Sequence, residues 1–338
     1  MLVVSQVTRV LSRGHPMRTS ALIFFLAFLS PFSFSEEIRV LTWNVESDLP
    51  FRQTNDPAVI AEQLTELQTE FGPYDVIGLT EVLASNAMRY KQAVETGQGE
   101  YHAFVSSTGG SDRMLLLIRA DRFEIIGDAA RELTRVGGPN SFRFPGGSAR
   151  RPFLAELRDR ENDGLEFIFM VNHLTRGNDR NRQRQAEGLR EWARQQTKPI
   201  IAVGDYNFDF DFRNLTGNQS MAIFMRRPAS EGGAFVWQWV IPSVEFTVTG
   251  DSDADRKVGM LVEWVDTNWS ERNGRDRYRD SMLDFVFTAQ GARDWAATAK
   301  VIVRPGDFPS DERTSDHRPV EATFDPKEKG VDVGGPRD

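Results

Sequence analysis

The stretch Thr314–Phe324 reads TSDHRPVEATF, and it places one of the four histidines of the 338-residue chain directly before a predicted strand. Apolar residues alternate with others from Val320 to Phe324, as in a strand with one buried face. The adjacent Asp316 and His317 stand outside that alternation, and an imidazole beside a carboxylate is suited to proton transfer. The stretch therefore predicts a core strand that delivers reactive groups to one edge of a sheet.

Other predicted strands also carry a carboxylate, an amide or an imidazole, and most carry it at the carboxyl end. The pairs are Ile38–Trp43 with Asn44, Asp75–Thr80 with Glu81, Leu165–Val171 with Asn172 and His173, Ile200–Val203 with Asp205 and Asn207, and Ser281–Phe287 (SMLDFVF) with Asp284. Each residue alone can be explained as a turn former or a cap. Asp284 is the exception, because an unpaired carboxylate inside an apolar run is costly. Recurrence over six strands favours one shared site.

Three of these residues have the chemistry of metal ligands. Asn44, Glu81 and Asp316 offer hard oxygen atoms, which Mg²⁺ prefers over softer donors. Mg²⁺ is therefore the expected ion, with Mn²⁺ and Ca²⁺ as alternatives. The chain has no cysteine, so disulfides and thiolate metal sites are both excluded.

The remaining residues of the set suit the hydrolysis of a phosphate ester. Asp205 can orient or deprotonate a water molecule, and Asn207 and His173 can donate hydrogen bonds to developing phosphate charge. Asp284 can hold His317 in one tautomer and raise its basicity. These roles suit a site that stabilises charge developing on a phosphate.

Secondary-structure patterns predict an α+β fold. Pro57–Phe71 has its apolar residues on one helical face and lies between two strands, which indicates a βαβ-like start. A second amphipathic helix is predicted over 178–196. Further strands are expected at Tyr101–Val105, Met114–Ile118, Phe123–Ile126, Phe153–Leu157 and Thr298–Val303. About a dozen short strands with few helices favour two packed sheets with outer helices over one parallel sheet.

One domain is predicted for residues 36–325, followed by a disordered polar tail over 326–338. The segment of about 208–280 departs from the strand rhythm and holds four tryptophans and a cluster of arginines between 272 and 279. We interpret this segment as an insertion within the domain, with a second small domain as the alternative.

Residues 1–35 have the pattern of a signal peptide. Arg18 precedes the apolar run Ala21–Leu29, and Ser33-Phe34-Ser35 is a small-x-small cleavage site. Because the run is shorter than the roughly 20 residues of a spanning helix, cleavage after Ser35 is favoured over an uncleaved anchor. The sequence predicts a secreted or periplasmic protein, and Met17 is an alternative start.

Net charge limits how an anionic substrate is recognised. The chain without residues 1–35 has 38 basic and 49 acidic residues, a difference of −11. This excludes a global positive field, so local arginines and a metal ion must attract the substrate.

Taken in order, these motifs resemble the endonuclease/exonuclease/phosphatase superfamily. The matching blocks are Leu41–Val45 (LTWNV), Asp75–Glu81 (DVIGLTE), Val171–Leu174 (VNHL), Gly204–Asn207 (GDYN), Ser281–Phe287 and Ser315–Pro319 (SDHRP). The resemblance covers residues 38–324. It implies a deoxyribonuclease I-like fold, a four-layer α/β/β/α sandwich with the site at one edge of the paired sheets.

The resemblance also implies roles for single residues. By position, Asn44 and Glu81 bind the metal with Asp316 beside them, and Asp205 and Asn207 flank the attacked phosphorus.

Two histidines complete the implied machinery. Asp284 and His317 form a carboxylate–imidazole pair, and His173 contacts phosphate or serves as an acid. The general base is His317 or Asp205, and we rank His317 first.

Two further residues are implied by the resemblance. Arg151, in Arg150-Arg151-Pro152, is expected to contact the substrate phosphate, with a solvated charge at a strand start as the alternative. Asp112 is expected to orient the first histidine of the site, His173.

The leading functional hypothesis is an exported, metal-dependent phosphodiesterase that acts as an endonuclease on nucleic-acid backbones. His173 after Asn172 resembles the deoxyribonuclease, phosphatase and sphingomyelinase branches more than the abasic-site repair branch. Four arginines between 176 and 184 suit an anionic substrate, although they also fit a solvated helix face. The sequence gives no sign of an obligate protein partner, and a monomer is expected.

Three alternatives stay open. The first is a phospholipid or sphingomyelin phosphodiesterase whose tryptophan-rich insertion reaches a membrane lipid, although such tryptophans more often belong to a core. The second is an inositol-phosphate phosphatase. The third is a non-catalytic binding module on the same fold.

Overall fold

The computed structural model describes residues 36–46, 55–134, 142, 150–211, 215–226, 235–243, 281–305, 307, 311 and 313–329. The chain divides into two units, Met1–Phe34 and Ser35–Asp338, and every described residue belongs to the second. The predicted signal peptide, Trp264, Trp269 and the arginines of 272–279 lie outside the described residues. Within the described ranges, no helix has both the length and the apolar character needed to cross a bilayer.

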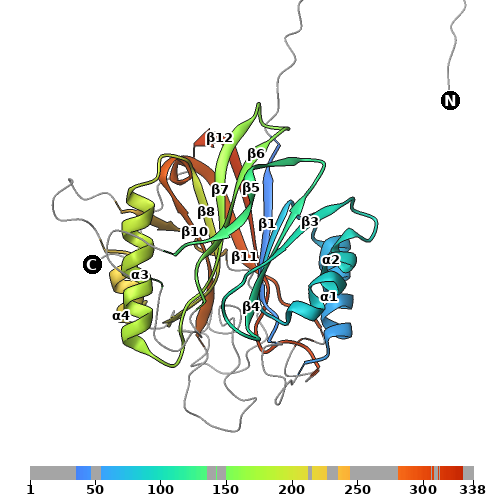
Figure 1. Cartoon of the computed structure of the whole chain (residues 1–338), viewed down its shortest axis with the longest axis horizontal. Coiled ribbons are helices and arrows are strands. Elements are labelled where there is room, and N and C mark those ends of the chain that lie inside the picture. The colour runs from blue at the N-terminus through green and yellow to red at the C-terminus, as the bar shows by residue number, and fades with distance from the viewer. Residues whose placement is uncertain are drawn as a thin grey trace, which may run out of the picture. The chain divides into compact units, whose positions relative to one another are not determined.

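Two six-stranded sheets form the framework (Figure 1). The first consists, in spatial order, of β11 (Trp295–Val301), β12 (Val320–Lys329), β1 (Ile38–Asn44), β2 (Val76–Val82), β4 (Arg113–Arg119) and β3 (Tyr101–Val105). The second consists of β5 (Phe123–Glu132), β6 (Phe153–Asp159), β7 (Leu165–His173), β8 (Ile200–Phe210), β10 (Met282–Ala289) and β9 (Trp237–Trp239). Strands β1 and β2 are parallel, as are β7 and β8, and the other strand pairs are antiparallel.

Each parallel pair is connected through a helix, as parallel strands require. Helix α1 (Pro57–Glu70) joins β1 to β2, and α3 (Asp179–Arg194) joins β7 to β8. Asp56 caps α1 by accepting a hydrogen bond from Ala58 N, and Asn178 caps α3 by accepting one from Asn181 N. These two units explain why the ends of β1, β2, β7 and β8 meet at one edge.

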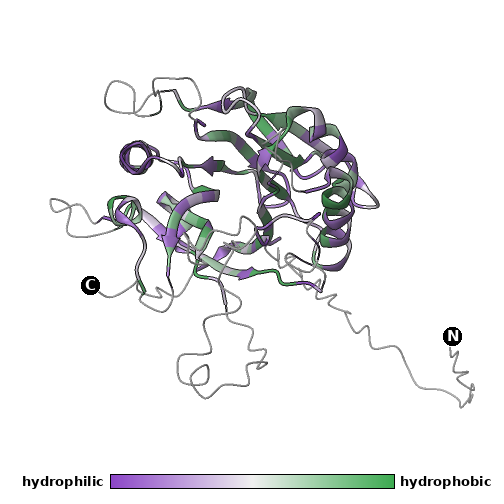
Figure 2. Ribbon diagram, turned by 90° about the horizontal axis from the view of Figure 1, so that it is seen from below, coloured by the Kyte–Doolittle hydropathy of each residue, from purple (hydrophilic) through white to green (hydrophobic). Residues whose placement is uncertain are grey.

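The helices lie on the outer faces of the sheets. Helices α1 and α2 (Ala87–Glu95) flank the first sheet, and α3 and α4 (Gln219–Phe224) flank the second (Figure 1). Apolar residues concentrate on the strands, whereas the helices carry many hydrophilic residues (Figure 2). The predicted four-layer α/β/β/α sandwich is confirmed.

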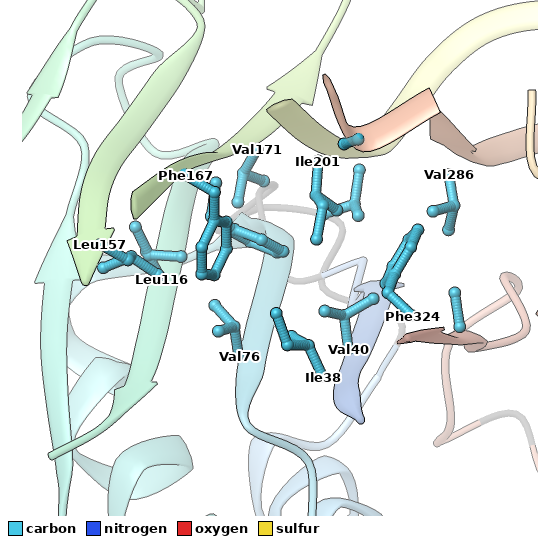
Figure 3. Close-up of a cluster of buried hydrophobic side chains, with 14 of the residues drawn as sticks. Ile38, Val40, Val76, Leu116, Leu157, Phe167, Val171, Ile201, Val286 and Phe324 are labelled. Atoms are coloured by element: carbon cyan, nitrogen blue, oxygen red, sulfur yellow. The ribbon is translucent and has the colours of Figure 1, made fainter. Parts of the chain in front are cut away.

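Alternation along the central strands builds three apolar layers. On β1, Val40 faces the other sheet while Leu41 faces the helices. On β7, Val171 faces the other sheet while Met170 faces the helices. Figure 3 shows the layer between the sheets, to which both sheets contribute side chains. A Cβ atom at Gly78 would lie 2.7 Å from Val171 Cγ2, so the sheets approach too closely there for any larger residue.

A buried arginine ties the two sheets together at the end remote from the predicted site. The guanidinium of Arg122 donates to Asp75, which precedes β2, at 2.8 Å and to Asp159, which ends β6, at 3.0 Å. It also donates to Glu37 O at 2.7 Å, which ties in the start of the described chain. These charges are paired internally, and their role is structural.

Two predictions about the chain's organisation need correction. The tail does not begin at residue 326, because β12 continues to Lys329, which pairs with Trp295. The register shifts between Trp295 and Ala296, and this irregularity accommodates Pro326. The strands predicted over Phe123–Ile126 and Ile200–Val203 are also too short. Both strands continue through polar residues, because the adjacent strands of the sheet pair with those residues.

The described part of the predicted insertion contributes to the sandwich. Strand β9 pairs with β10 at the edge of the second sheet, and α4 covers that region. Trp237 and Trp239 are buried in an aromatic cluster with Phe224 and Phe285. These two tryptophans are therefore part of the hydrophobic core.

Candidate active site

His317 and Asp284 form a buried pair at the edge of the sheets. His317 Nδ1 donates to Asp284 Oδ2 at 2.6 Å, and Asp284 lies opposite Asp205 in the β10–β8 register. Burial lowers the pKa of His317, but the carboxylates of Asp284, Asp316 and Asp205 outweigh it and raise the pKa to about 10. The neighbouring carboxylates therefore favour the protonated imidazole.

His173 and Asp112 form a second pair of the same kind. His173 Nδ1 donates to Asp112 Oδ1 at 3.0 Å, which directs Nε2 toward Asp205 Oδ2, 3.4 Å away, and Glu81 Oε1, 3.6 Å away. Arg150 holds the pair, since its guanidinium donates to Asp112 Oδ2 and, at 3.1 Å, to His173 O.

Asn44 connects the two sheets at the centre of the site. Its Nδ2 donates to Glu81 Oε1 at 2.9 Å and to Asp205 Oδ2 at 3.1 Å, and it lies 3.4 Å from His317 Nε2. The two carboxylates and both imidazoles thus border one small space.

Local backbone geometry brings these groups together. In the parallel registers Asn44 pairs with Thr80 and His173 with Asp205, so both strand pairs end at the same edge. Glu81 has a φ of 57° at an irregularity between Leu79 and Val82, an uncommon conformation for a non-glycine residue. Such strain is concentrated at functional sites.

Gly204 also has a backbone conformation that other residues rarely adopt. Its φ is 125°, and a Cβ atom there would lie 2.0 Å from Asn172 O. Only glycine allows β8 to pass so close to β7 directly before Asp205.

The donor set fits a divalent cation. Ligand atoms of Glu81, His173 and Asp205 lie within 4.8 Å of one another. Asp316 Oδ1 is buried and makes no hydrogen bond within the described part of the chain, so a cation would satisfy it. Carboxylate and amide oxygens are the ligands expected for Mg²⁺.

The structure places most of the predicted site residues in one cluster. These are Asn44, Glu81, Asp112, His173, Asp205, Asn207, Asp284, Asp316 and His317. Asn207 differs from its predicted role as a phosphate donor, because Nδ2 donates to Leu174 O at 2.9 Å and Oδ1 accepts from Arg176 at 2.8 Å.

Arg151, which is expected to contact the substrate phosphate, lies beside Thr108 and Glu132. Its backbone N donates to Thr108 Oγ1, and its guanidinium lies 3.9 Å from Glu132. Arg150 reaches His173 and Asp112 instead. The phosphate contact of Arg151 stays a prediction.

Two residues that hold His317 were not among the predicted site residues. Ser315 Oγ donates to Asn44 O at 2.6 Å and accepts from His317 N at 3.0 Å. Trp43 Nε1 donates to His317 O at 2.9 Å. Trp43 directly precedes Asn44 and Ser315 stands two residues before His317, and this proximity in sequence is the signal that could have identified them.

Replacing Ser315 by alanine is expected to lower kcat by about 10-fold to 100-fold, because His317 loses the hydroxyl that ties it to β1. Steady-state kinetics on a phosphodiester substrate measures this effect. Thr288→Ala is the matched control, since it removes another buried hydroxyl from the core. Full activity of Ser315→Ala would show that the hydroxyl does not position His317.

Comparison with known proteins places this geometry in a family. The model of the Endonuclease/Exonuclease/phosphatase family matches residues 41–317. No sequence among the curated proteins matches the chain.

Several solved structures share the fold. An endonuclease/exonuclease/phosphatase family protein from Bacteroides thetaiotaomicron is 16% identical, with a TM-score of 0.60, over 86% of this chain and 98% of its own. TDP2 from D. rerio, complexed with single-strand DNA product, is 16% identical, with a TM-score of 0.59, over 86% of this chain and 99% of its own. A mannosyl-6-phosphatase from B. thetaiotaomicron is 16% identical, with a TM-score of 0.56, over 85% and 99%. At these identities the likeness establishes the fold alone.

Proposed function

Because the chain belongs to the endonuclease/exonuclease/phosphatase family, whose members are metal-dependent phosphoester hydrolases, we propose that it is an exported, Mg²⁺-dependent endonuclease of nucleic-acid backbones. One observation carries the proposal. Two imidazoles, each held at Nδ1 by a carboxylate, present Nε2 to a space shared with Glu81 and Asp205.

This arrangement suits a diester. Hydrolysis of a phosphodiester requires a group that activates water and a group that donates a proton or hydrogen bond to the departing oxygen. Two opposed imidazoles with a carboxylate between them provide both. Asp284 holds His317 Nδ1 at 2.6 Å and raises the pKa of the imidazole, so we assign His317 as donor to the phosphate and Asp205 as the group that orients the attacking water. Asp205, rather than His317, is therefore the proposed base.

A bound Mg²⁺ would supply Lewis-acid polarisation of a phosphoryl oxygen. Glu81 would hold it from the first sheet, with Asp316 beside it. Asn44, predicted as a ligand, presents its Nδ2 to Glu81 and Asp205, whereas its Oδ1 accepts a hydrogen bond from Glu46 N at 3.0 Å. Asp205 accepts a hydrogen bond from Asn207 N at 2.8 Å, which keeps its carboxylate oriented toward the shared space.

Export supports a substrate outside the cytoplasm. The apolar leader with its cleavage site supports export. The lipid alternative loses support, because Trp237 and Trp239 belong to the core. The TDP2 structure contains single-strand DNA, whereas another neighbour is a sugar phosphatase, so the substrate needs a direct test.

The test is a substrate panel on the purified protein. Circular plasmid DNA, circular single-stranded DNA, RNA, sphingomyelin, an inositol polyphosphate, mannose 6-phosphate and bis(4-nitrophenyl) phosphate are each incubated with Mg²⁺, Mn²⁺, Ca²⁺ or EDTA. We expect internal cleavage of circular nucleic acid that is lost in EDTA and restored by Mg²⁺. Turnover confined to lipid or to a monoester would overturn the proposal.

A further inference from the structure

Arg176 lies at the border of the site, in contact with Asn207. Its guanidinium donates to Asn207 Oδ1 at 2.8 Å and lies 3.7 Å from Asp209 Oδ1. Asn207 in turn donates through its backbone N to Asp205. The side chain of Arg176 is 33% exposed, so a cation next to the reacting groups reaches solvent.

The loop that carries Arg176 is held in place by buried side chains. Arg182 donates to Thr175 O at 3.0 Å and to Arg176 O at 2.8 Å, and Gln185 Oε1 accepts from Thr175 N at 2.9 Å. Both Arg182 and Gln185 are buried. The backbone of Arg176 is therefore fixed by the fold, unlike that of an ordinary surface arginine.

Two other arginines near the site, Arg150 and Arg182, bind groups of the protein itself. Arg150 binds Asp112 and the carbonyls of His173 and Leu174. Arg182 is buried against the loop and Asp179. Arg176 combines exposure with a fixed backbone, and its planar guanidinium suits a phosphate.

We propose that Arg176 binds the phosphate next to the scissile one, so that the site selects substrates with consecutive phosphodiesters. Arg176 is bound to Asn207, and the backbone N of Asn207 is bound to Asp205. The cation is therefore separated by one residue from the carboxylate that orients the attacking water, and it is partly exposed to solvent where a further phosphate of the strand can reach it. This inference rests on the proposed function. It assigns Arg176 as the residue that makes the site specific for a polymeric substrate.

The test compares two substrates that differ in phosphate number. Wild type, Arg176→Gln and Arg176→Lys are assayed on a single-stranded oligodeoxynucleotide and on bis(4-nitrophenyl) phosphate, which has one phosphate. We expect Arg176→Gln to lower kcat/KM at least about 10-fold on the oligonucleotide and by less than about threefold on the single diester. Arg176→Lys should recover part of the loss.

Salt dependence provides a second readout. Loss of one phosphate contact should reduce the slope of log(1/KM) against log salt concentration by about 0.7 on the oligonucleotide. Arg160→Gln is the matched control, because it removes the same charge at the opposite end of the sheets, where Arg160 donates to Ala120 O. It should leave both substrates unaffected.

Each outcome separates the two proposals. Equal losses on both substrates would show that Arg176 acts through Asn207 and would overturn the inference, as would an unchanged oligonucleotide rate. Either result leaves the endonuclease proposal standing if wild type cleaves nucleic acid with Mg²⁺. Wild-type protein that cleaves no nucleic acid would overturn both.

Discussion

Replacement of His317 by alanine is expected to lower kcat by about 10²-fold to 10⁴-fold, the usual contribution of a positioned acid or base. His317 Nδ1 is bound to Asp284 at 2.6 Å, and its backbone is held by Ser315 and Trp43. This support aims Nε2 at the space next to Asn44 and Asp205.

The pH profile distinguishes a donor from a base at this position. A donor must be protonated, so activity should fall as pH rises through the pKa of His317. That pKa is about 10 without metal and lies lower when a cation neutralises the nearby carboxylates. Asp284→Asn removes the carboxylate that raises it, so the alkaline limb of kcat/KM should move to lower pH. If Asp284→Asn instead moves the acidic limb of the kcat/KM profile, His317 acts as the base.

His102→Ala is the matched control for this variant. His102 is an exposed histidine on β3, and its replacement should leave kcat unchanged. If His317→Ala retains wild-type kcat, the assignment of the buried pair to the reaction is wrong.

The same pKa predicts how the stability of the metal-free protein depends on pH. The folded-state pKa of His317 lies above the ordinary value of 6.5, so the pair with Asp284 stabilises the fold fully below about pH 6.5. This contribution declines above that pH and is lost as the pH passes about 10. Urea unfolding of wild type and His317→Gln should therefore differ most at acidic pH, and a difference that grows toward pH 10 would contradict the sign.

Replacement of Glu81 by glutamine should lower kcat/KM by at least about 10²-fold at low Mg²⁺, because the first sheet loses its carboxylate at the proposed metal position. Glutamine keeps the shape of the side chain at a residue whose φ is 57°. It also keeps a hydrogen-bond acceptor for Asn44 Nδ2. The loss should therefore reflect charge and metal affinity more than folding.

Thermal unfolding with and without Mg²⁺ provides a readout separate from activity. A cation that binds only the folded protein raises its Tm by an amount that grows with the logarithm of its affinity, and Glu81→Gln should weaken this rise. Glu156→Gln, which removes a carboxylate paired with Arg131 and Lys198 on the surface, is the control and should keep it. Full Mg²⁺ stabilisation of Glu81→Gln would exclude Glu81 as a ligand.

Much of the site was predictable because strand ends carry chemical information. Asn44 and His173 end strands that are parallel to β2 and β8, and parallel neighbours present their carboxyl ends at one edge. Asp284 was recognisable by its cost inside an apolar run.

Roles that depend on side-chain direction were not predictable. Arg150 and Arg151 are adjacent, and only the structure shows that Arg150 faces His173. Asn207 was expected to donate to phosphate, yet both ends of its amide are bound by Leu174 and Arg176. That contact joins positions 31 residues apart, so no local pattern contains it.

The sequence by itself determined the class of fold, the edge of the sheets where the chemistry lies and most of the residues that carry it. These follow from the period of apolar residues and from the polar residue that ends each strand, and both are local properties of the chain. Only the tertiary structure decided which partner each side chain has. The pairing of His317 with Asp284, the clamp by Arg150 and the position of Arg176 depend on two sheets packed face to face. That packing sets distances between residues far apart in sequence.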